Sequence, residues 1–452
     1  MKSLLGPSIQ IDPSFPYYSN RSEQSIADEL LAAGYRVVHY FVTDETKVNG
    51  KLVDRLHREG MTVWAMVLGN GAYTTAHLPK DWPDWQMQLL KPVHDGYYRL
   101  SPFSYRYTEW KKQAAADLVR TYPFDGFEIA EPYFPEWNGL SSGVYGDLGP
   151  YARAQFKLQY GSPIPEFRYS SSPHYYKSNP ILYRQWIEFR VDAVNRFLFE
   201  IINGPGGVRE ARPDIRIATW SLGVDAGPDA VGKLREYQGI DAVSMVSTVR
   251  PDAHFVQTHW PDWMRWRLPA DYAKRYEPFV ARVRVLHPGL PLGLQTDIGS
   301  LKPMRRSRGW LERFAAVSGA LGYATWTAYE HHLGKAMYTE QPQPVRAERH
   351  GEERVKIVFQ KRVDPASASP PDRYEIVTGR KSSSHPLYPD HVKVDGSTVW
   401  LRSGQFPKEA FELSVSGIKD TPELWLFPEK RGNEMSAPYH IKVDGTDKNS
   451  SL

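Results

Sequence analysis

Five carboxylates stand at or just after the ends of short apolar runs that recur along the chain. They are Asp12, Glu128, Glu131, Asp297 and Glu330. Unpaired carboxylates in a shared cleft push one another's pKa apart, so one stays protonated while another stays ionised. Hydrolysis of a glycosidic bond needs such a pair, because one group protonates the leaving oxygen and the other acts as nucleophile or base. The residue types therefore fit sugar hydrolysis.

Aromatic residues are the second feature with chemical meaning. The chain has 14 Trp, 27 Tyr and 18 Phe, most of which we expect in the core. The segment 254–267 differs, because Trp260, Trp263 and Trp266 stand there among prolines and charged residues. Rings exposed in loops stack on sugars or form partner surfaces. We expect this loop to bind sugar through at least one ring, with Trp263 the first candidate; packing onto the fold is the alternative.

Strands and helices alternate up to about residue 334, and these elements must position the carboxylates. Eight strands separated by amphipathic helices predict a parallel sheet with right-handed crossovers, closed as a (β/α)8 TIM barrel. A doubly wound open sheet is the alternative, but it usually carries a Gly-rich turn after the first strand, and none is present. The predicted strands are 3–12, 36–43, 61–69, 125–131, 215–223, 240–247, 290–298 and 323–330. The predicted helices are 22–34, 49–60, 107–122, 181–202, 228–239, 271–289 and 307–322.

Alternation along each strand predicts which side chains face the barrel axis. In 125–131, Phe127 and Ile129 face the helices and Glu128 faces inward, so Glu131 begins the loop at the barrel mouth. Barrel enzymes place their chemistry at this end of the strands. We expect all five carboxylates to gather there, so that two of them can form the catalytic pair. The expected substrate-binding residues are Asp12, His39, Glu128, Trp220, Trp263, Trp326 and Glu330.

After residue 340 the pattern changes to short strands of period two without helices. About seven such strands predict a small antiparallel β-sandwich. This part resembles the Ig-like modules that follow many bacterial surface and carbohydrate-active enzymes, and we assign it no chemistry. The expected domains are a barrel at 1–338, a sandwich at 345–444 and a disordered tail at 445–452. Six predicted strands lie at 353–360, 373–379, 391–396, 397–402, 410–417 and 423–428.

Three motifs carry a resemblance to the large clan of retaining glycosidases that includes the β-galactosidases. The segment Glu128-Ile-Ala-Glu131-Pro resembles the Asn-Glu-Pro motif of the clan's fourth strand. Thr-Asp297-Ile-Gly resembles the Thr-Glu-x-Gly motif of its seventh strand, and ATWTAYEHH resembles its Trp-bearing eighth strand. The resemblance spans about residues 3–334. It implies that Glu131 is the acid/base and Asp297 the nucleophile.

Two positions depart from these motifs. Ala130 replaces the Asn that would hold the sugar 2-hydroxyl, and Asp297 replaces a Glu that is one methylene longer. A shorter carboxylate widens the gap toward the roughly 6.5–9.5 Å that admits a water, which gives inversion of the anomeric centre. The departures also leave room for a carbohydrate-binding barrel without catalysis, or for another hydrolase or lyase that uses the same carboxylates.

Composition excludes several other classes of function. The absence of cysteine rules out disulfides and thiolate chemistry, and a net charge of +4 without a Lys/Arg block argues against nucleic acid. No cofactor motif is present, and the adjacent His331 and His332 point to opposite sides of a strand, so we expect no cofactor and no metal. No apolar run is long enough to cross a membrane. The start reads as a strand and suits the cytoplasm, or an exported protein whose signal peptide was removed; the oligomeric state is open.

The segment 132–180 is rich in Pro, Tyr and Ser. A connection this long inside a compact domain is usually functional or disordered. We expect it to cover the barrel mouth and shape the substrate cleft, with a peripheral excursion as the alternative.

Overall fold

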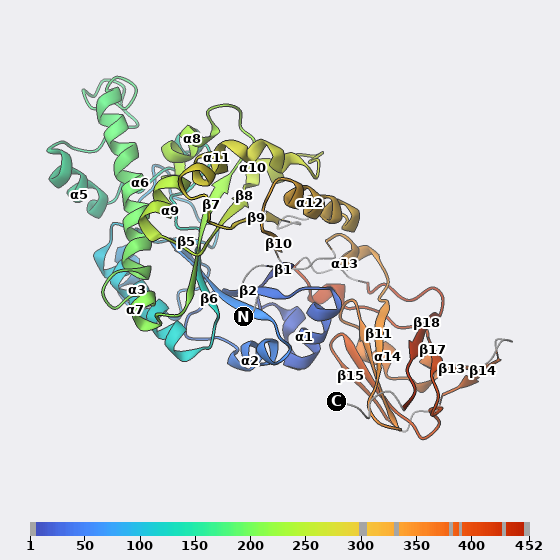
Figure 1. Cartoon of the computed structure of the whole chain (residues 1–452). Coiled ribbons are helices and arrows are strands. Elements are labelled where there is room, and N and C mark those ends of the chain that lie inside the picture. Colours follow the sequence, from blue (N-terminus) through green and yellow to red (C-terminus); the bar gives the residue numbers. More distant parts are fainter. Residues whose placement is uncertain are drawn as a thin grey trace.

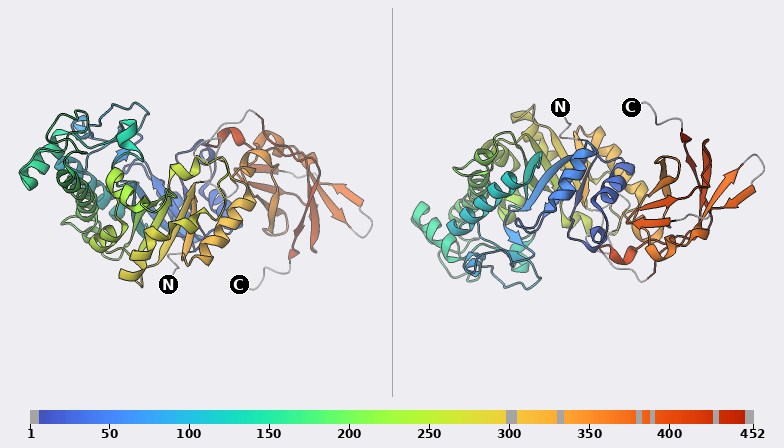
Figure 2. Two further views of the ribbon diagram at one scale, coloured as in Figure 1. Left: turned by 90° about the horizontal axis from the view of Figure 1, so that it is seen from above. Right: turned by 90° about the horizontal axis from the view of Figure 1, so that it is seen from below.

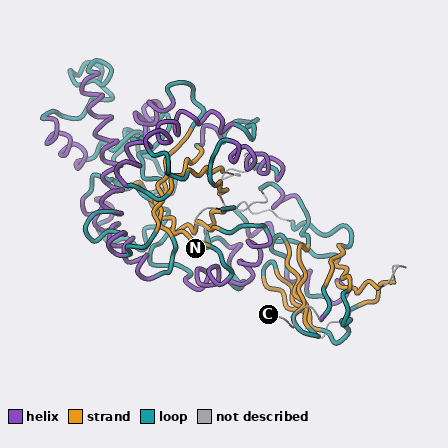
Figure 3. The backbone as a smooth tube through the Cα atoms, viewed as in Figure 1, coloured by secondary structure: helices purple, strands orange, loops and turns teal. Residues whose placement is uncertain are grey.

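Eight parallel strands close into a barrel surrounded by helices (Figures 1 and 3). The computed structural model describes residues 6–297, 305–329, 334–378, 383–387, 391–426 and 431–446. Around the barrel the order is β1-β10-β9-β8-β7-β6-β3-β2. The prediction of a (β/α)8 barrel is confirmed. The strands are β1 (Ser8–Ile11), β2 (Val37–Val42), β3 (Thr62–Leu68), β6 (Gly126–Ala130), β7 (Arg216–Gly223), β8 (Ala253–Thr258), β9 (Leu292–Asp297) and β10 (Thr325–Tyr329).

The helices of the barrel begin at capping residues that the sequence supplies. Ser22, Asn49, Ser104, Asn179 and Ser307 each accept a hydrogen bond from the backbone N–H three residues further on, which satisfies a donor that the first helical turn leaves free. These caps begin α1 (Glu23–Ala32), α2 (Gly50–Arg58), α3 (Tyr105–Thr121), α6 (Pro180–Ile202) and α12 (Arg308–Ala320). The remaining helices up to residue 339 are α4 (Gly139–Ser142), α5 (Pro150–Tyr160), α7 (Val208–Ala211), α8 (Ala230–Gln238), α9 (Ala242–Val249), α10 (Trp260–Trp263), α11 (Glu277–Leu286) and α13 (Ala336–Thr339).

The predicted sixth strand, 240–247, is wrong. This segment forms α9, whose Asp241 cap accepts from the N–H of Ser244 and whose buried Met245, Val246 and Val249 follow helical spacing. The sixth barrel strand is instead β8, which the sequence placed in the aromatic loop 254–267. His254 and Gln257 interrupt its apolar pattern. His254 shares the helix-facing side with Val256, and its two ring nitrogens lie 2.8 Å from Thr219 Oγ1 and Ser221 Oγ, whereas Gln257 alternates onto the barrel side with Phe255.

Two apolar layers lie on either side of the strands. Ile9, Phe127 and Ile129 belong to the large cluster between strands and helices, as alternation predicted. A smaller cluster fills the barrel itself, and Trp64, Trp220 and Phe255 are its largest rings. The barrel is therefore packed solid along its axis, so any ligand site must lie at its mouth.

Two four-stranded antiparallel sheets follow the barrel in the chain, and they fit the predicted all-β domain. Their orders are β11-β12-β16-β15 and β14-β13-β17-β18, and apolar residues of both sheets share one core. Figure 2 shows the sheets at one end of an elongated molecule and the barrel at the other. The strands are β11 (Pro344–Arg349), β12 (Arg354–Phe359), β13 (Tyr374–Thr378), β14 (Ser383–Pro386), β15 (His391–Asp395), β16 (Thr398–Arg402), β17 (Phe411–Val415) and β18 (Tyr439–Val443).

Two details of this region differ from the predictions. The stretch 344–349, which is not among the six predicted strands, is strand β11 and pairs with β12. The expected strand at 423–428 begins as the 3-10 helix η6 (Pro422–Leu424), after which Trp425 packs on aromatic rings of the barrel. The likeness to Ig-like modules and the domain bounds stay predictions. Most of the expected tail, from residue 447, lies outside the described residues.

The segment 132–180 has two parts that lie in different places. Its first residues run along the barrel mouth, whereas α5 and the start of α6 project beyond the barrel (Figure 1). Arg190 of α6 holds residues 145–146 of this segment in place, because its buried guanidinium donates to the hydroxyl of Tyr145 and to the carbonyls of Gly146, Glu236 and Tyr237.

Within the described residues, no helix is both long and apolar enough to cross a membrane.

Candidate active site

Hydrogen bonding between β3 and β6 continues past the ends of both strands and brings two loops together. The N–H of Gly69 donates to Ala130 O at 2.7 Å, and the N–H of Asn70 donates to Glu131 O at 3.1 Å. A side chain at residue 69 would collide with Pro132, since its Cβ would lie 2.7 Å from Pro132 Cα. Glycine at this position therefore lets Asn70 and Glu131 begin their loops side by side at the C-terminal end of the strands.

A short hairpin places a tyrosine hydroxyl on Glu131. Strand β4 (Gly71–Ala72) pairs with β5 (Tyr98–Arg99). Any Cβ at residue 71 would overlap the ring of Tyr97, which lies 2.1 Å from that position, so glycine allows the ring to pass. The Tyr97 hydroxyl donates to Glu131 Oε2 at 2.9 Å. The carboxylate predicted as the acid thus has a defined neutral partner.

Burial raises the pKa of Glu131, while the Tyr97 hydrogen bond and the charge of Arg99 oppose that rise. No Lys, Arg or His among the described residues forms an ion pair with Glu131. Its backbone φ of 53° lies in the left-handed region, which non-glycine residues seldom adopt and which recurs at functional sites. The group is therefore poised to carry a proton at a pH where an ordinary glutamate is ionised.

A pocket of about 350 Å³ opens beside this carboxylate, and we call it the Glu131 pocket. Four aromatic rings and several polar side chains form its wall, and together they offer both stacking and hydrogen bonding. Its lining residues are Asn70, Tyr73, Asp95, Tyr97, Arg99, Glu131, Tyr133, Pro135, Glu136, Gln238, His259 and Trp260. They come from loops after β3, β6 and β8, from the hairpin loop and from the end of α8.

A second carboxylate of the pocket has a similar electrostatic setting. Burial raises the pKa of Glu136, Arg99 lowers it and Asp95 raises it. Arg99 itself is engaged, because its Nη2 and Nη1 donate to the two carboxylate oxygens of Asp95 at 2.7 and 3.1 Å. The positive charge of the pocket is thus already paired within the hairpin.

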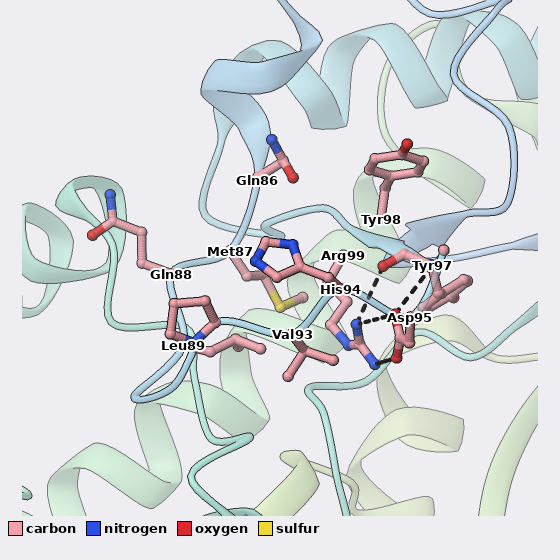
Figure 4. A pocket seen from close by; sticks show the side chains of 12 residues that line it. Gln86, Met87, Gln88, Leu89, Val93, His94, Asp95, Tyr97, Tyr98 and Arg99 are labelled. Carbon is pink, nitrogen blue, oxygen red and sulfur yellow. Dashed lines mark hydrogen bonds and ion pairs between the residues drawn. The ribbon is translucent and has the colours of Figure 1, made fainter.

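A larger pocket of about 600 Å³ adjoins the first and shares Asp95, Tyr97 and Arg99 with it. Figure 4 shows it lined by the segment 86–99, with the Arg99–Asp95 ion pair at one side. The two hollows therefore adjoin at the part of the hairpin that carries Asp95, Tyr97 and Arg99.

Three residues expected to contact substrate lie inside the barrel instead. Glu128 is fully buried, accepts from Trp220 Nε1 at 2.9 Å and lies 2.6 Å from His39 Nδ1. All three side chains face the axis, as alternation predicted for Glu128, but none lines the Glu131 pocket. His39 and Trp220 occupy the two carboxylate oxygens of Glu128, so the three side chains form a polar layer in the barrel core.

The other predicted contacts have varied surroundings. Asp12 is 5% exposed, and its Oδ1 accepts from the N–H and hydroxyl of Ser14 at 2.9 and 2.6 Å, which is a turn arrangement. Trp263 is half-buried, and its Nε1 donates to Thr258 Oγ1 at 2.7 Å. Trp326 does not face the mouth, because its ring packs edge-on against Phe314 of α12.

The roles predicted for Asp297 and Glu330 stay predictions. Asp297 ends β9, and its backbone pairs with Tyr329 of β10, so it stands at the same end of the barrel as Glu131. Its side chain lies outside the described residues, and so does all of Glu330.

Sequence reasoning missed Asn70, Tyr97, Arg99, Gln238 and His259. Asn70 carries a signal of the same kind as Glu131, since it directly follows the predicted strand 61–69 and Glu131 is the last residue of the predicted strand 125–131. Arg99 belongs to the two-residue strand β5, and Tyr97 stands directly before it, where no periodicity marks either residue. His259 follows β8, so the misplaced sixth strand concealed its position at the mouth.

The described residues contain no group of three or more His, Cys, Asp or Glu side chains that could hold a metal ion.

Comparison with known proteins finds similarity in structure and not in sequence. No protein-family model matches the chain, and no curated protein is similar to it in sequence.

Solved glycosidases share the barrel. The cold-adapted β-galactosidase from Rahnella sp. R3 is 16% identical, with a TM-score of 0.50 over 73% of this chain and 50% of that chain. A catalytic mutant of Gan42B, a GH42 β-galactosidase from G. stearothermophilus, is 16% identical, with a TM-score of 0.48 over 73% and 51%. The match thus spans about half the length of these β-galactosidases. At such identity the likeness shows the fold alone.

Proposed function

We propose that this protein is a glycoside hydrolase in which Glu131 is the general acid and Asp297 the nucleophile or base. The observation that most supports this proposal is the environment of the Glu131 side chain. That side chain is a carboxyl group with a raised pKa, a tyrosine hydroxyl as its partner and no ion pair with a described residue, at the mouth of a barrel. A general acid needs this combination, because it must hold its proton near neutral pH and release it to the leaving oxygen.

The surroundings support a sugar as the substrate. Tyr73, Tyr97, Tyr133 and Trp260 give the pocket aromatic walls, onto which the apolar face of a pyranose can stack. The pocket also offers amide and imidazole groups that suit hydroxyls. In this proposal Glu131 protonates the glycosidic oxygen, and Asp297, at the end of β9, acts from the opposite face of the ring.

The first experiment is a hydrolysis screen of aryl glycosides and glycans, with product anomers followed by NMR. On the substrate found, Glu131→Gln keeps the side-chain shape but cannot donate a proton. We expect it to lower kcat by ~10²–10⁴ for poor leaving groups and far less for activated aryl glycosides. Asp297→Asn should abolish both activities, because a nucleophile or base is needed whatever the leaving group.

Equal losses of Glu131→Gln on good and poor leaving groups would remove Glu131 from the acid role. Glu136→Gln is the matched control, because Glu136 lines the same pocket and burial also raises its pKa. A pattern that depends on the leaving group in Glu136→Gln instead would transfer the role to Glu136. Full activity of both variants would contradict the proposed mechanism.

A further inference from the structure

Three polar side chains of the Glu131 pocket are buried with unused hydrogen-bonding atoms. Asn70 is 2% exposed, Gln238 1% and His259 5%. Both amide atoms of Asn70, Oε1 of Gln238 and Nε2 of His259 have no hydrogen-bond partner within the described part of the chain. Such groups are rare in folded proteins, and each costs about 1–3 kcal/mol if it stays unpaired. All three line one pocket, which indicates that a ligand satisfies them.

The backbone around these side chains is held in place. Asn70 donates its N–H to Glu131 O and accepts from the N–H of Leu100 at 2.9 Å. Gln238 O accepts from the N–H of Phe134 at 3.1 Å, and His259 O accepts from the N–H of Asp262 at 3.0 Å. The unused atoms therefore belong to residues whose main chain is already fixed before any ligand binds, which lowers the entropic cost of binding.

The side chains of Asn70, Gln238 and His259 carry no charge. Burial lowers the pKa of His259 to about 3, so its imidazole is uncharged at physiological pH. The one cation among the lining residues, Arg99, is paired with Asp95. A carboxylate or sulfate on the ligand would meet no free positive group there, and it would lie near the carboxyls of Glu131 and Glu136. An amide that both donates and accepts, beside a neutral imidazole, suits hydroxyl groups.

We propose that Asn70, Gln238 and His259 form a hydroxyl-binding set that selects an uncharged sugar unit. This inference rests on the proposed glycosidase function, whose acid lies in the same pocket, and it adds the class of sugar recognised. The specificity has a physical basis, because a site built to bond a hydroxyl leaves buried groups unpaired when an analogue lacks that hydroxyl.

Binding is tested apart from hydrolysis, by isothermal titration calorimetry on the full chain carrying Glu131→Gln. The probes are neutral gluco-, manno- and galacto-oligosaccharides, anionic oligogalacturonides and cationic chitosan oligomers. We expect a neutral probe to bind at least ~10-fold more tightly than either charged class. Asn70→Ala and Gln238→Met, added singly, should weaken the best neutral probe by ~10-fold or more.

Thermal unfolding separates recognition from a structural role. Removal of an unpaired buried amide should leave the Tm unchanged or raise it, because the group contributes nothing to the folded state without ligand. Gln113→Ala is the control, since Gln113 is exposed on α3 and bonds only to Asp117 on the same helix. It should change neither binding nor Tm.

Several results would overturn this inference. Tighter binding of a charged probe, binding of no probe, unchanged affinity in both variants, or a lowered Tm in both would each do so. The proposed function fails separately, because a wild-type protein that binds neutral probes but hydrolyses none loses the glycosidase assignment while the hydroxyl-binding set stands.

Discussion

Tyr97 controls the acidity of Glu131 from a loop that sequence periodicity does not mark. Its hydroxyl donates to Oε2 at 2.9 Å and therefore stabilises the ionised carboxylate. Burial acts in the opposite direction and is the larger influence on the pKa of Glu131. Burial therefore raises the pKa of Glu131, and the Tyr97 hydrogen bond limits that rise.

Tyr97→Phe removes this hydrogen bond and keeps the ring. The pKa of Glu131 should then rise further, because the charged form loses a donor and burial remains. A general acid works while it is protonated, so the alkaline limb of the kcat/KM profile should move to higher pH. The measurement is a pH–rate profile on the substrate found in the screen.

Tyr98→Phe is the matched control for this variant. Tyr98 is the next residue of the hairpin, is 38% exposed, and packs edge-on against Trp82. Its profile should coincide with that of the wild type. An alkaline limb that stays in place in Tyr97→Phe would show that another group sets it.

The sequence revealed the part of the site that strands position and not the part that loops supply. Alternation along β6 placed Glu128 inward and Glu131 at the mouth, because side chains on a strand point to opposite faces in turn. It did not reveal that Glu128 is satisfied by His39 and Trp220 in the packed barrel. That outcome depends on contacts across the barrel, which one strand's pattern does not contain.

At the scale of elements, the region between β7 and β9 shows where the pattern misled. The stretch 240–247 is apolar enough for a strand, yet its Asp241 cap and the spacing of Met245, Val246 and Val249 are helical. The strand that the barrel required begins at Ala253. Because β8 is short and carries His254 and Gln257, its pattern alone does not distinguish it from a loop.

This shift changes which ring of the aromatic loop is expected to bind sugar. Helix α10 ends at Trp263, so the three tryptophans do not share one face. Trp260 lines the Glu131 pocket, Trp263 bonds to Thr258, and Trp266 is 89% exposed. Trp260 is therefore the ring nearest the proposed chemistry.

Trp260→Ala should raise KM by ~10-fold or more, as expected for the loss of a ring stack worth about 1.5 kcal/mol. Trp263→Ala is the comparison, and it should lower the Tm with little change in KM, because its indole holds the end of β8. Steady-state kinetics and thermal unfolding separate the two. The reverse pattern would restore Trp263 as the sugar contact.

At the scale of the whole molecule, the β-sheets contact the side of the barrel that carries the loop after β1. The backbone N–H of Arg362 donates to the Tyr17 hydroxyl, and its guanidinium donates to Tyr17 O at 2.8 Å and Ser19 O at 2.6 Å. Lys356 reaches the buried carboxylate of Asp28 in α1 at 3.1 Å. These contacts fix a loop that starts at Asp12, so the sheets act as structural support for one sector of the barrel mouth.

Trp425 is the apolar centre of this interface. Its ring centroid lies 4.6 Å from that of Tyr17, 6.2 Å from Tyr18 and 6.5 Å from Phe15, each in an edge-on arrangement. It is 6% exposed, although it belongs to the sheet region of the chain and its neighbours belong to the barrel. Much of the coupling between the two parts should therefore depend on this ring.

Trp425→Ala should destabilise the protein by ~3 kcal/mol, because it opens a cavity among three rings that cannot easily collapse. If the ring couples the two parts, their unfolding should also separate, and calorimetry should show two transitions where the wild type shows one. Limited proteolysis should then cut the variant near residues 13–22, where the loop has lost its cover. Trp266→Ala, at a site 89% exposed, should leave the calorimetric trace unchanged. A single transition at the wild-type temperature in Trp425→Ala would mean that the polar contacts of Arg362 and Lys356 suffice to hold the sheets against the barrel.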